Sequence, residues 1–123
     1  MWYCAHAIFY FKLKKEPQES FLIHENVYLI QADNEQRAME DAEAIAKENE
    51  DLSEDGHLEL NEKPACYVFA GIRKLIEVEA NNDTARGLLL SGVEVTYSEM
   101  EVDTIDEVNS LANGDFVNIL YRE

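Results

Sequence analysis

The residues with the most versatile chemistry lie near the start of the chain. One alanine separates Cys4 from His6, and His24 follows in the next strand-like segment. Thiols and imidazoles bind metals, but a structural zinc site uses four protein ligands and a catalytic site three. The second cysteine, Cys66, completes no CxxC or Cys/His spacing. The sequence therefore predicts no metal site and no disulfide, and we expect two reduced, buried thiols.

Motifs of common catalytic sites are absent from the sequence. It contains no GxxxxGK[ST], GxGxxG, HExxH or GxSxG segment. Carboxylate pairs such as Glu99 and Glu101 are frequent, but a pair becomes an acid and a base only where the environment separates the two pKa values. The sequence assigns no catalytic residue and no cofactor, and it favours a protein that is not an enzyme.

Acidic residues dominate the charge of the chain. Its 26 Asp and Glu residues against 10 Lys and Arg residues give a formal net charge of −16. This charge repels phosphate backbones and anionic lipids, so we expect no direct binding to nucleic acid or to membranes. Acidity can serve solubility alone. It can also attract a basic protein, or mimic a nucleic acid and so inhibit its binding protein.

Length and hydropathy indicate one folded domain over residues 1–123. The chain is 46% hydrophobic, and a domain of this size buries roughly two-thirds of the surface of its unfolded chain. The longest apolar run, residues 65–72, is far shorter than the roughly 20 residues of a membrane-spanning helix. No secretory segment precedes the first aromatic residues. We therefore expect a cytoplasmic protein.

Alternation and turn signals predict five strands and two helices. Capping boxes at Asp33–Gln36 and Thr104–Glu107 begin the helices, and the second helix ends at Asn113–Gly114. The charged residues 48–63 form a surface connection, and residues 85–91 an irregular apolar link. The expected strands cover residues 2–13, 21–32, 64–78, 93–102 and 116–121. The order ββ-α-β-β-α-β predicts an α+β domain with a largely antiparallel sheet and its helices packed on one face.

The first helix carries a narrow, alanine-rich apolar stripe that includes Ala38, Ala42 and Ala46. Small residues let a helix lie close to a sheet, and the first strand has Ala5 and Ala7 on its odd-numbered face. We therefore expect the odd-numbered residues of this strand to face the core.

The even-numbered face of the first two strands is the predicted working surface. A loop centred near Pro17 would pair Tyr10 with His24, Ile8 with Asn26, His6 with Tyr28 and Cys4 with Ile30. A shift of one residue would move the second strand's side chains to the other face. The predicted register groups aromatic and polar side chains of the type found in interfaces. They are Trp2, His6, Tyr10, His24, Asn26 and Tyr28.

Three interpretations of this surface stay open. Other parts of the chain cover it, or it forms a homodimer or partner interface, or it holds a small-ligand pocket that uses His6 and His24. The leading hypothesis is a non-enzymatic interaction module that forms a homodimer or binds a protein partner. A small-ligand sensor or minor enzyme and the acidic inhibitor are its alternatives.

Several segments carry a family resemblance. They are residues 2–6 (WYCAH), 25–30 (ENVYLI), 69–75 (FAGIRKL), 91–98 (SGVEVTYS) and 111–114 (LANG). In this order the chain resembles a family of small bacterial proteins, frequent in cyanobacteria, that is known only as a domain of unknown function. The resemblance implies a bacterial cytosolic protein and supplies no catalytic or binding residue.

Four positions of this pattern, His6, Gly71, Gly92 and Glu94, are present here, whereas Cys4 lies outside it. The glycines suit a bulge, a turn or a close backbone approach. Glu94 either pairs with Arg73 between strands or presents its charge to a ligand.

Overall fold

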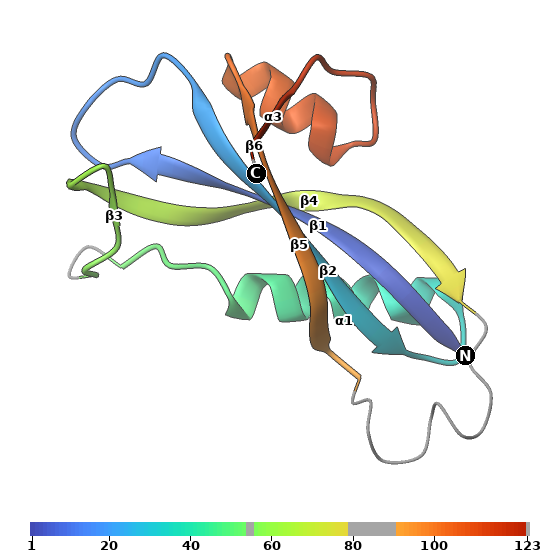
Figure 1. The fold of residues 1–123 in the computed structure, drawn as a ribbon. Coiled ribbons are helices and arrows are strands. Elements are labelled where there is room, and N and C mark those ends of the chain that lie inside the picture. The colour runs from blue at the N-terminus through green and yellow to red at the C-terminus, as the bar shows by residue number, and fades with distance from the viewer. Residues whose placement is uncertain (54–55, 79–90, 123) are drawn as a thin grey trace.

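A six-stranded sheet with strand order β3-β4-β1-β2-β5-β6 forms the centre of the molecule (Figure 1). The computed structural model describes residues 1–53, 56–78 and 91–122. Neighbouring strands pair antiparallel throughout this described part. The strands are β1 (Trp2–Leu13), β2 (Phe21–Gln31), β3 (Glu59–Leu60), β4 (Lys63–Val78), β5 (Val93–Val102) and β6 (Leu120–Arg122). The predicted α+β class is confirmed, and the short β3 is an addition to the predicted order.

Two helices complete the described fold, α1 (Glu35–Glu48) and α3 (Ile105–Ala112). The second cap is confirmed at its predicted residue, because the Thr104 hydroxyl accepts from the Glu107 N–H at 3.1 Å and donates to the Glu107 carboxylate at 3.2 Å. The first begins one residue later than expected. Asn34, not Asp33, caps α1, and its side-chain oxygen accepts from the Arg37 N–H at 2.9 Å.

The first apolar cluster lies between α1 and the odd-numbered residues of β1, as predicted. Ala38, Ala42 and Ala46 of the helix and Ala5 and Ala7 of the strand are all fully buried. This close contact needs the small side chains of both elements. The predicted inward face of β1 is confirmed.

A second apolar cluster contacts the other face of β1. Ile8 packs there with Val108 and Leu111 of α3. Opposite Ile8 on β4, a Cβ added at Gly71 would lie 3.3 Å from the Ala112 Cβ. The predicted close approach at Gly71 is thus confirmed.

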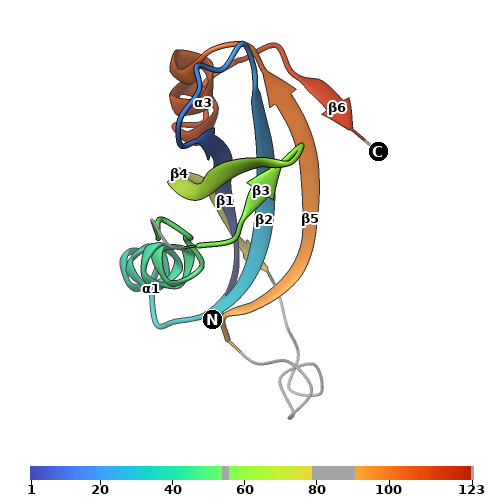
Figure 2. The same cartoon turned by 90° about the vertical axis from the view of Figure 1, so that its left-hand side faces the viewer.

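The two helices lie on the same side of β2 and β5 in Figure 2, yet they contact opposite faces of the pleated strand β1. Long strands twist along their length, so a face that points one way at one end points elsewhere at the other. Both helices therefore lie on one side of the molecule, as expected. They nevertheless contact different sets of alternating residues of β1.

The predicted register between β1 and β2 is wrong by one residue. Tyr10 pairs with Ile23, and the same offset pairs Ala7 with Asn26 and Ala5 with Tyr28. The loop is held by Gln18, whose side chain accepts from the Leu13 N–H and donates to the Phe11 carbonyl. As a result, the side chains of His24, Asn26 and Tyr28 on β2 lie on the face of the sheet that α1 covers, and not on the even-numbered face of β1 as predicted.

Two further expectations differ from the structure. The predicted surface connection contains β3, and the last strand covers only residues 120–122 rather than 116–121. Most of the link expected at residues 85–91, and the strand end expected at residues 81–83, lie outside the described residues. Neither described helix is long and apolar enough to span a membrane.

Candidate functional site

A hydrogen-bond network centred on Tyr67 lies on the face of the sheet that α1 covers. The Tyr67 hydroxyl accepts from the Asn26 side-chain amide at 2.9 Å and lies 3.0 Å from His24 Nδ1. The other ring nitrogen of His24 is 3.2 Å from the Glu99 carboxylate. The Tyr67 ring is stacked on Phe9 with centroids 4.6 Å apart. Side chains from β1, β2, β4 and β5 thus meet at one place.

One arrangement of donors and acceptors satisfies the whole network. Since Asn26 donates to the Tyr67 oxygen, the Tyr67 hydroxyl hydrogen is free to bond to His24 Nδ1 when that nitrogen carries no hydrogen. Nε2–H of His24 then donates to Glu99. This arrangement satisfies the amide, the hydroxyl and both ring nitrogens.

Burial keeps the hydroxyls of Tyr28 and Tyr67 protonated. It raises the pKa of Tyr67 far above the ordinary tyrosine value and outweighs the opposing hydrogen bond from Asn26. The pKa of Tyr28 is raised by burial too, although hydrogen bonds from Asn26 and Asn49 lower it. Neither hydroxyl is a nucleophile at neutral pH, so the site offers hydrogen-bond donors rather than a catalytic phenolate.

The network borders an open pocket of about 570 Å³. Tyr28 forms part of its wall, and the Tyr28 hydroxyl accepts from the Asn49 side chain at 2.9 Å. Asn49 is also the C-cap of α1, so the partly negative end of the helix dipole lies at the pocket. The complete lining is His24, Asn26, Tyr28, Asn49, Tyr67, Gly92, Glu94 and Tyr97.

Gly92, directly before β5, and Glu94, near its start, line the pocket. Gly92 has a φ of +91°, which only glycine adopts readily, and a Cβ there would lie 3.1 Å from the Ile45 Cδ1. The positive φ expected for a turn at Gly92 is therefore present. Glu94 is exposed, and the described lining holds this carboxylate, several aromatic rings and no lysine or arginine.

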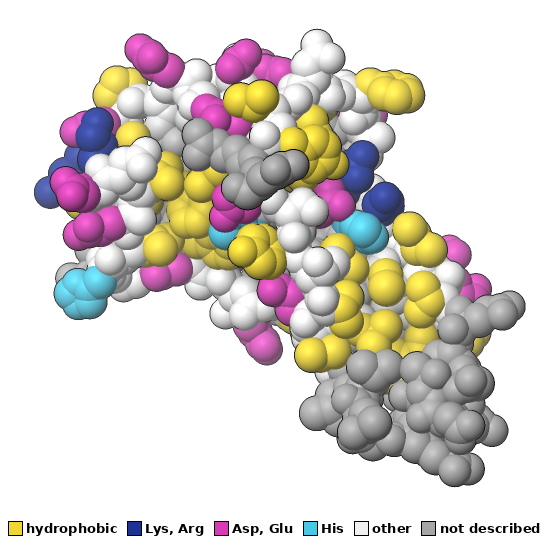
Figure 3. Space-filling model, in the orientation of Figure 1, with side chains coloured by type: hydrophobic (Ala, Val, Ile, Leu, Met, Phe, Trp, Pro, Cys, Tyr) yellow, Lys and Arg dark blue, Asp and Glu magenta, His cyan; other side chains and the backbone are white. Residues whose placement is uncertain are grey.

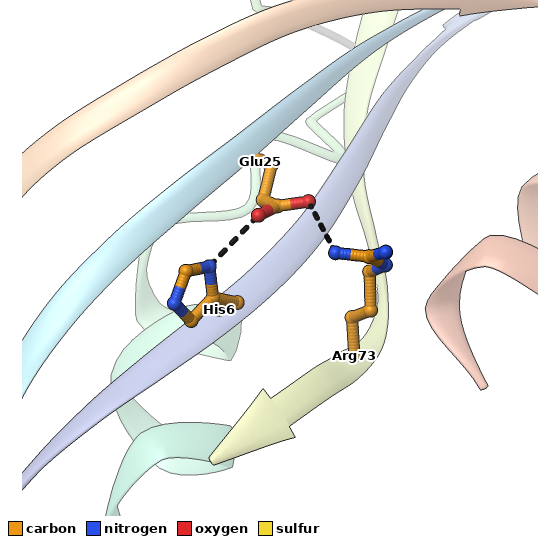
Figure 4. A network of polar contacts seen from close by, with 3 residues as sticks. All are labelled: His6, Glu25 and Arg73. Carbon is orange, nitrogen blue, oxygen red and sulfur yellow. Dashed lines mark hydrogen bonds and ion pairs between the residues drawn. The ribbon is translucent and has the colours of Figure 1, made fainter. Parts of the chain in front are cut away.

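A separate polar cluster occupies the opposite face of the sheet (Figure 4). The Glu25 carboxylate is 2.8 Å from His6 Nδ1 and 3.4 Å from an Arg73 guanidinium nitrogen. Arg73 falls at a bulge, because β1 residue His6 pairs with Lys74 and the next residue, Ala7, pairs with Ile72. The bulge turns Arg73 toward Glu25.

The structure divides the six predicted surface residues between the two faces. Trp2, His6 and Tyr10 stay on the even-numbered face of β1, where Trp2 is buried and Tyr10 packs edge-on against Phe21. His24, Asn26 and Tyr28 line the pocket on the other face. The one-residue register difference causes this division. A pocket that combines His6 with His24 is therefore wrong, whereas a pocket beside His24 is present.

The charge pair predicted between Arg73 and Glu94 is not formed. Arg73 belongs to β4 and Glu94 to β5, and two strands lie between them in the sheet order. With a strand spacing of about 4.8 Å, this places their backbones roughly 14 Å apart. Glu25 takes the partner position beside Arg73.

Sequence reasoning missed Tyr67, Asn49 and Glu25 as site residues. Tyr67 sits in the apolar run of β4 and Asn49 at the end of α1, so neither stands out locally. The feature of the sequence that could have indicated a polar site here is Asn26. An amide in the middle of a strand that is only 6% exposed requires polar partners on the neighbouring elements.

The two cysteines are free and only half-buried, rather than buried as expected. Burial raises the pKa of the Cys4 thiol. Within the described residues, no three side chains of metal-ligand type form a group that could hold an ion.

The fold and the site define a small α+β domain with an acidic, aromatic pocket on its sheet. Residues 2–95 match the family described as a domain of unknown function (DUF4288), and the chain belongs to this family. All residues that line the pocket, except Tyr97, fall within the matched range. Neither the curated proteins nor the solved structures contain a significant match to the chain.

Proposed function

We propose that this protein binds a small cationic ligand, such as an amine or a quaternary ammonium compound, in the pocket beside Tyr67. The observation that carries the proposal is the lining itself, in which Glu94 and the side chains of Tyr28, Tyr67 and Tyr97 surround one cavity that has no lysine or arginine in its described lining. Aromatic faces attract cations through their quadrupole, and the carboxylate adds direct charge attraction.

Selectivity comes from the polar groups behind the rings. The Tyr28 hydroxyl accepts from Asn49, and its own hydrogen is available to an acceptor on the ligand. The Tyr67 hydroxyl is held by Asn26 and His24, so the wall is arranged before the ligand arrives and little ordering entropy is lost. Binding without catalysis fits the protonated tyrosines. A cytoplasmic location is part of the proposal and is supported by the two unpaired cysteines, and a bacterial origin is part of it through the family resemblance alone.

The test is a titration of isotope-labelled protein with tetramethylammonium chloride, followed by nuclear magnetic resonance. Sodium acetate and neopentyl alcohol (2,2-dimethylpropan-1-ol), a neutral compound of similar shape to the cation, are the comparison probes. The cation should shift the amide signals of Gly92, Glu94 and Tyr97, and acetate should not. Equal shifts for the cation and the neutral probe, or none at the pocket, would refute the proposal.

Two variants with the same charge change separate local from general attraction. Glu94→Gln removes the pocket carboxylate and should weaken tetramethylammonium binding about tenfold, which corresponds to about 1.4 kcal/mol. Glu59→Gln removes an exposed carboxylate on β3 and should leave binding unchanged. If both variants weaken binding equally, the attraction belongs to the net charge and not to the pocket.

A further inference from the structure

The outer edge of β5 is open along residues 93–98. On one side, β2 pairs with β5 from Val93 to Val102. On the other side, β6 reaches only Glu99 to Glu101. Among the described residues, no strand pairs with the remaining part of this edge, which faces away from both helices (Figure 2). Unpaired backbone N–H and C=O groups on such an edge are a template for another strand.

The composition of this edge favours pairing. Its sequence, VEVTYS, contains no lysine, arginine or proline, the residues that commonly protect an open edge. Val93, Val95 and Tyr97 are 40%, 47% and 56% exposed. Figure 3 shows hydrophobic and acidic side chains interspersed on the side of the molecule that β5 crosses. Apolar side chains and free backbone groups thus occur together.

We propose that residues 93–98 of β5 pair antiparallel with the same residues of a second copy, which joins two sheets into one. A two-fold axis between Val95 and Thr96 pairs Glu94 with Tyr97 of the partner subunit, and Val93 with Ser98 of the partner subunit. Such an isologous contact uses the same segment of both copies.

A bulge in β5 selects this register. Tyr97 lies opposite Asn26 and Glu94 lies opposite Tyr28, so Val95 is an extra residue between them. Residues three apart on a regular strand point to opposite faces, but the bulge places Glu94 and Tyr97 on the same face, and both line the pocket. Side chains that oppose each other across an antiparallel pair must share a face. Glu94 and Tyr97 are therefore matched partners across the two-fold axis.

Other registers of the same edge are worse. A two-fold axis at Glu94 would set the two Glu94 carboxylates opposite each other, which is repulsive. An axis at Tyr97 would direct the second copy into β6, which already pairs with Glu99 to Glu101. The axis between Val95 and Thr96 is the one that uses the whole open segment.

The second copy would complete the ligand pocket. Glu94 and Tyr97 form the β5 side of this pocket, and pairing brings Tyr97 of the partner subunit beside Glu94. Each of the two symmetric pockets gains an aromatic ring at the position of its carboxylate. A cation held there contacts both copies, so it should bind the dimer more tightly than the monomer.

Charge makes the dimer dependent on salt. Each copy carries a formal net charge of −16, so two copies repel each other at low ionic strength, and salt screens this repulsion. The dimer should therefore become tighter as sodium chloride is added, in contrast to a contact held by opposite charges.

Sedimentation velocity of the full chain across micromolar concentrations, at low and high sodium chloride, tests the association. We expect a monomer–dimer equilibrium that shifts toward dimer with salt. Val95→Lys and Thr96→Lys, each an exposed position on this edge, should raise the dissociation constant at least about tenfold. The matched variant Ile76→Lys, at an exposed apolar position on β4, should not. Circular dichroism verifies that each variant is folded.

Cysteine cross-linking tests the register. In a background of Cys4→Ala and Cys66→Ala, an equal mixture of Val95→Cys and Thr96→Cys chains should form a disulfide-linked dimer on mild oxidation. Either variant alone, or a mixture of Ile76→Cys with Thr96→Cys, should form far less. A protein that stays monomeric at high salt, or a dimer that both lysine variants leave intact, overturns the proposal. A dimer that cross-links equally in all mixtures overturns the register.

The outcomes for the dimer and for the ligand are distinguishable. The tetramethylammonium titration can be carried out on the monomeric Val95→Lys variant. Binding to that variant, with no dimer in the unmodified protein, would refute the contact and retain the pocket. A dimer that binds no cation would retain the contact between copies and refute the proposed ligand pocket.

Discussion

Replacement of Tyr67 by phenylalanine isolates the hydroxyl through which β4 contacts Asn26 and His24 of β2. The Tyr67 ring would keep its stacking on Phe9, so the substitution removes only the polar contacts. Two contacts are lost, one from the Asn26 amide and one to His24 Nδ1. Each hydrogen bond contributes about 1 kcal/mol net, and pocket water can replace part of the loss for the groups that remain. The free energy of unfolding should fall by about 2 kcal/mol.

The assay is thermal and urea unfolding of Tyr67→Phe beside Tyr10→Phe. Tyr10 is also partly buried, but no hydrogen bond joins its hydroxyl to another described residue. At about 4 °C for each kcal/mol in a domain of this size, the melting temperature of Tyr67→Phe should fall by roughly 8 °C. Tyr10→Phe should change it by only a degree or two. Equal stability of the two variants would refute the idea that the network organises the pocket wall.

Three further predictions concern the rest of the sheet. Gly71→Ala adds a Cβ 3.3 Å from the Ala112 Cβ and should destabilise the protein by about 1–2 kcal/mol in urea unfolding. Unchanged stability would mean that α3 shifts to accept the added methyl group and that its close contact with β4 is not required. Glu25→Ala removes the carboxylate that bridges a histidine and an arginine and should cost about 2 kcal/mol, whereas a stabilised variant would contradict that role. Because the pKa values of Tyr28 and Tyr67 are raised on folding, stability should hold up to the ordinary tyrosine pKa near 10 and decline above it. A rise in stability across that range in alkaline unfolding experiments would have the wrong sign.

Local patterns were sufficient to predict the long strands and the helices of this fold, but not the short β3 or the bounds of β6. The alternation of residues 93–102 predicted β5 with its observed bounds, and the Thr104 cap marked the start of α3. The alanine stripe of α1 identified the odd-numbered face of β1 as its contact. Each of these features depends on side-chain periodicity or on hydrogen bonds within a few residues, which the sequence contains directly.

The candidate site was only half predictable. The sequence groups His24, Asn26 and Tyr28, and the structure keeps them together, but they line the pocket rather than the face of the sheet that carries His6. Their face depends on a register that the Gln18 side chain helps to hold through contacts across the loop. A change of one residue reverses the face of every side chain in a strand.

The sequence by itself determined the four long strands, the helices and the inward face of β1. The tertiary structure decided which strands are neighbours and in which register. Through these it brought Tyr67 to Asn26 and His24, turned Arg73 toward Glu25 instead of Glu94, and left the outer edge of β5 open. The physical reason is that periodicity fixes the direction of a side chain relative to its own strand, whereas pairing between distant strands fixes what that side chain meets.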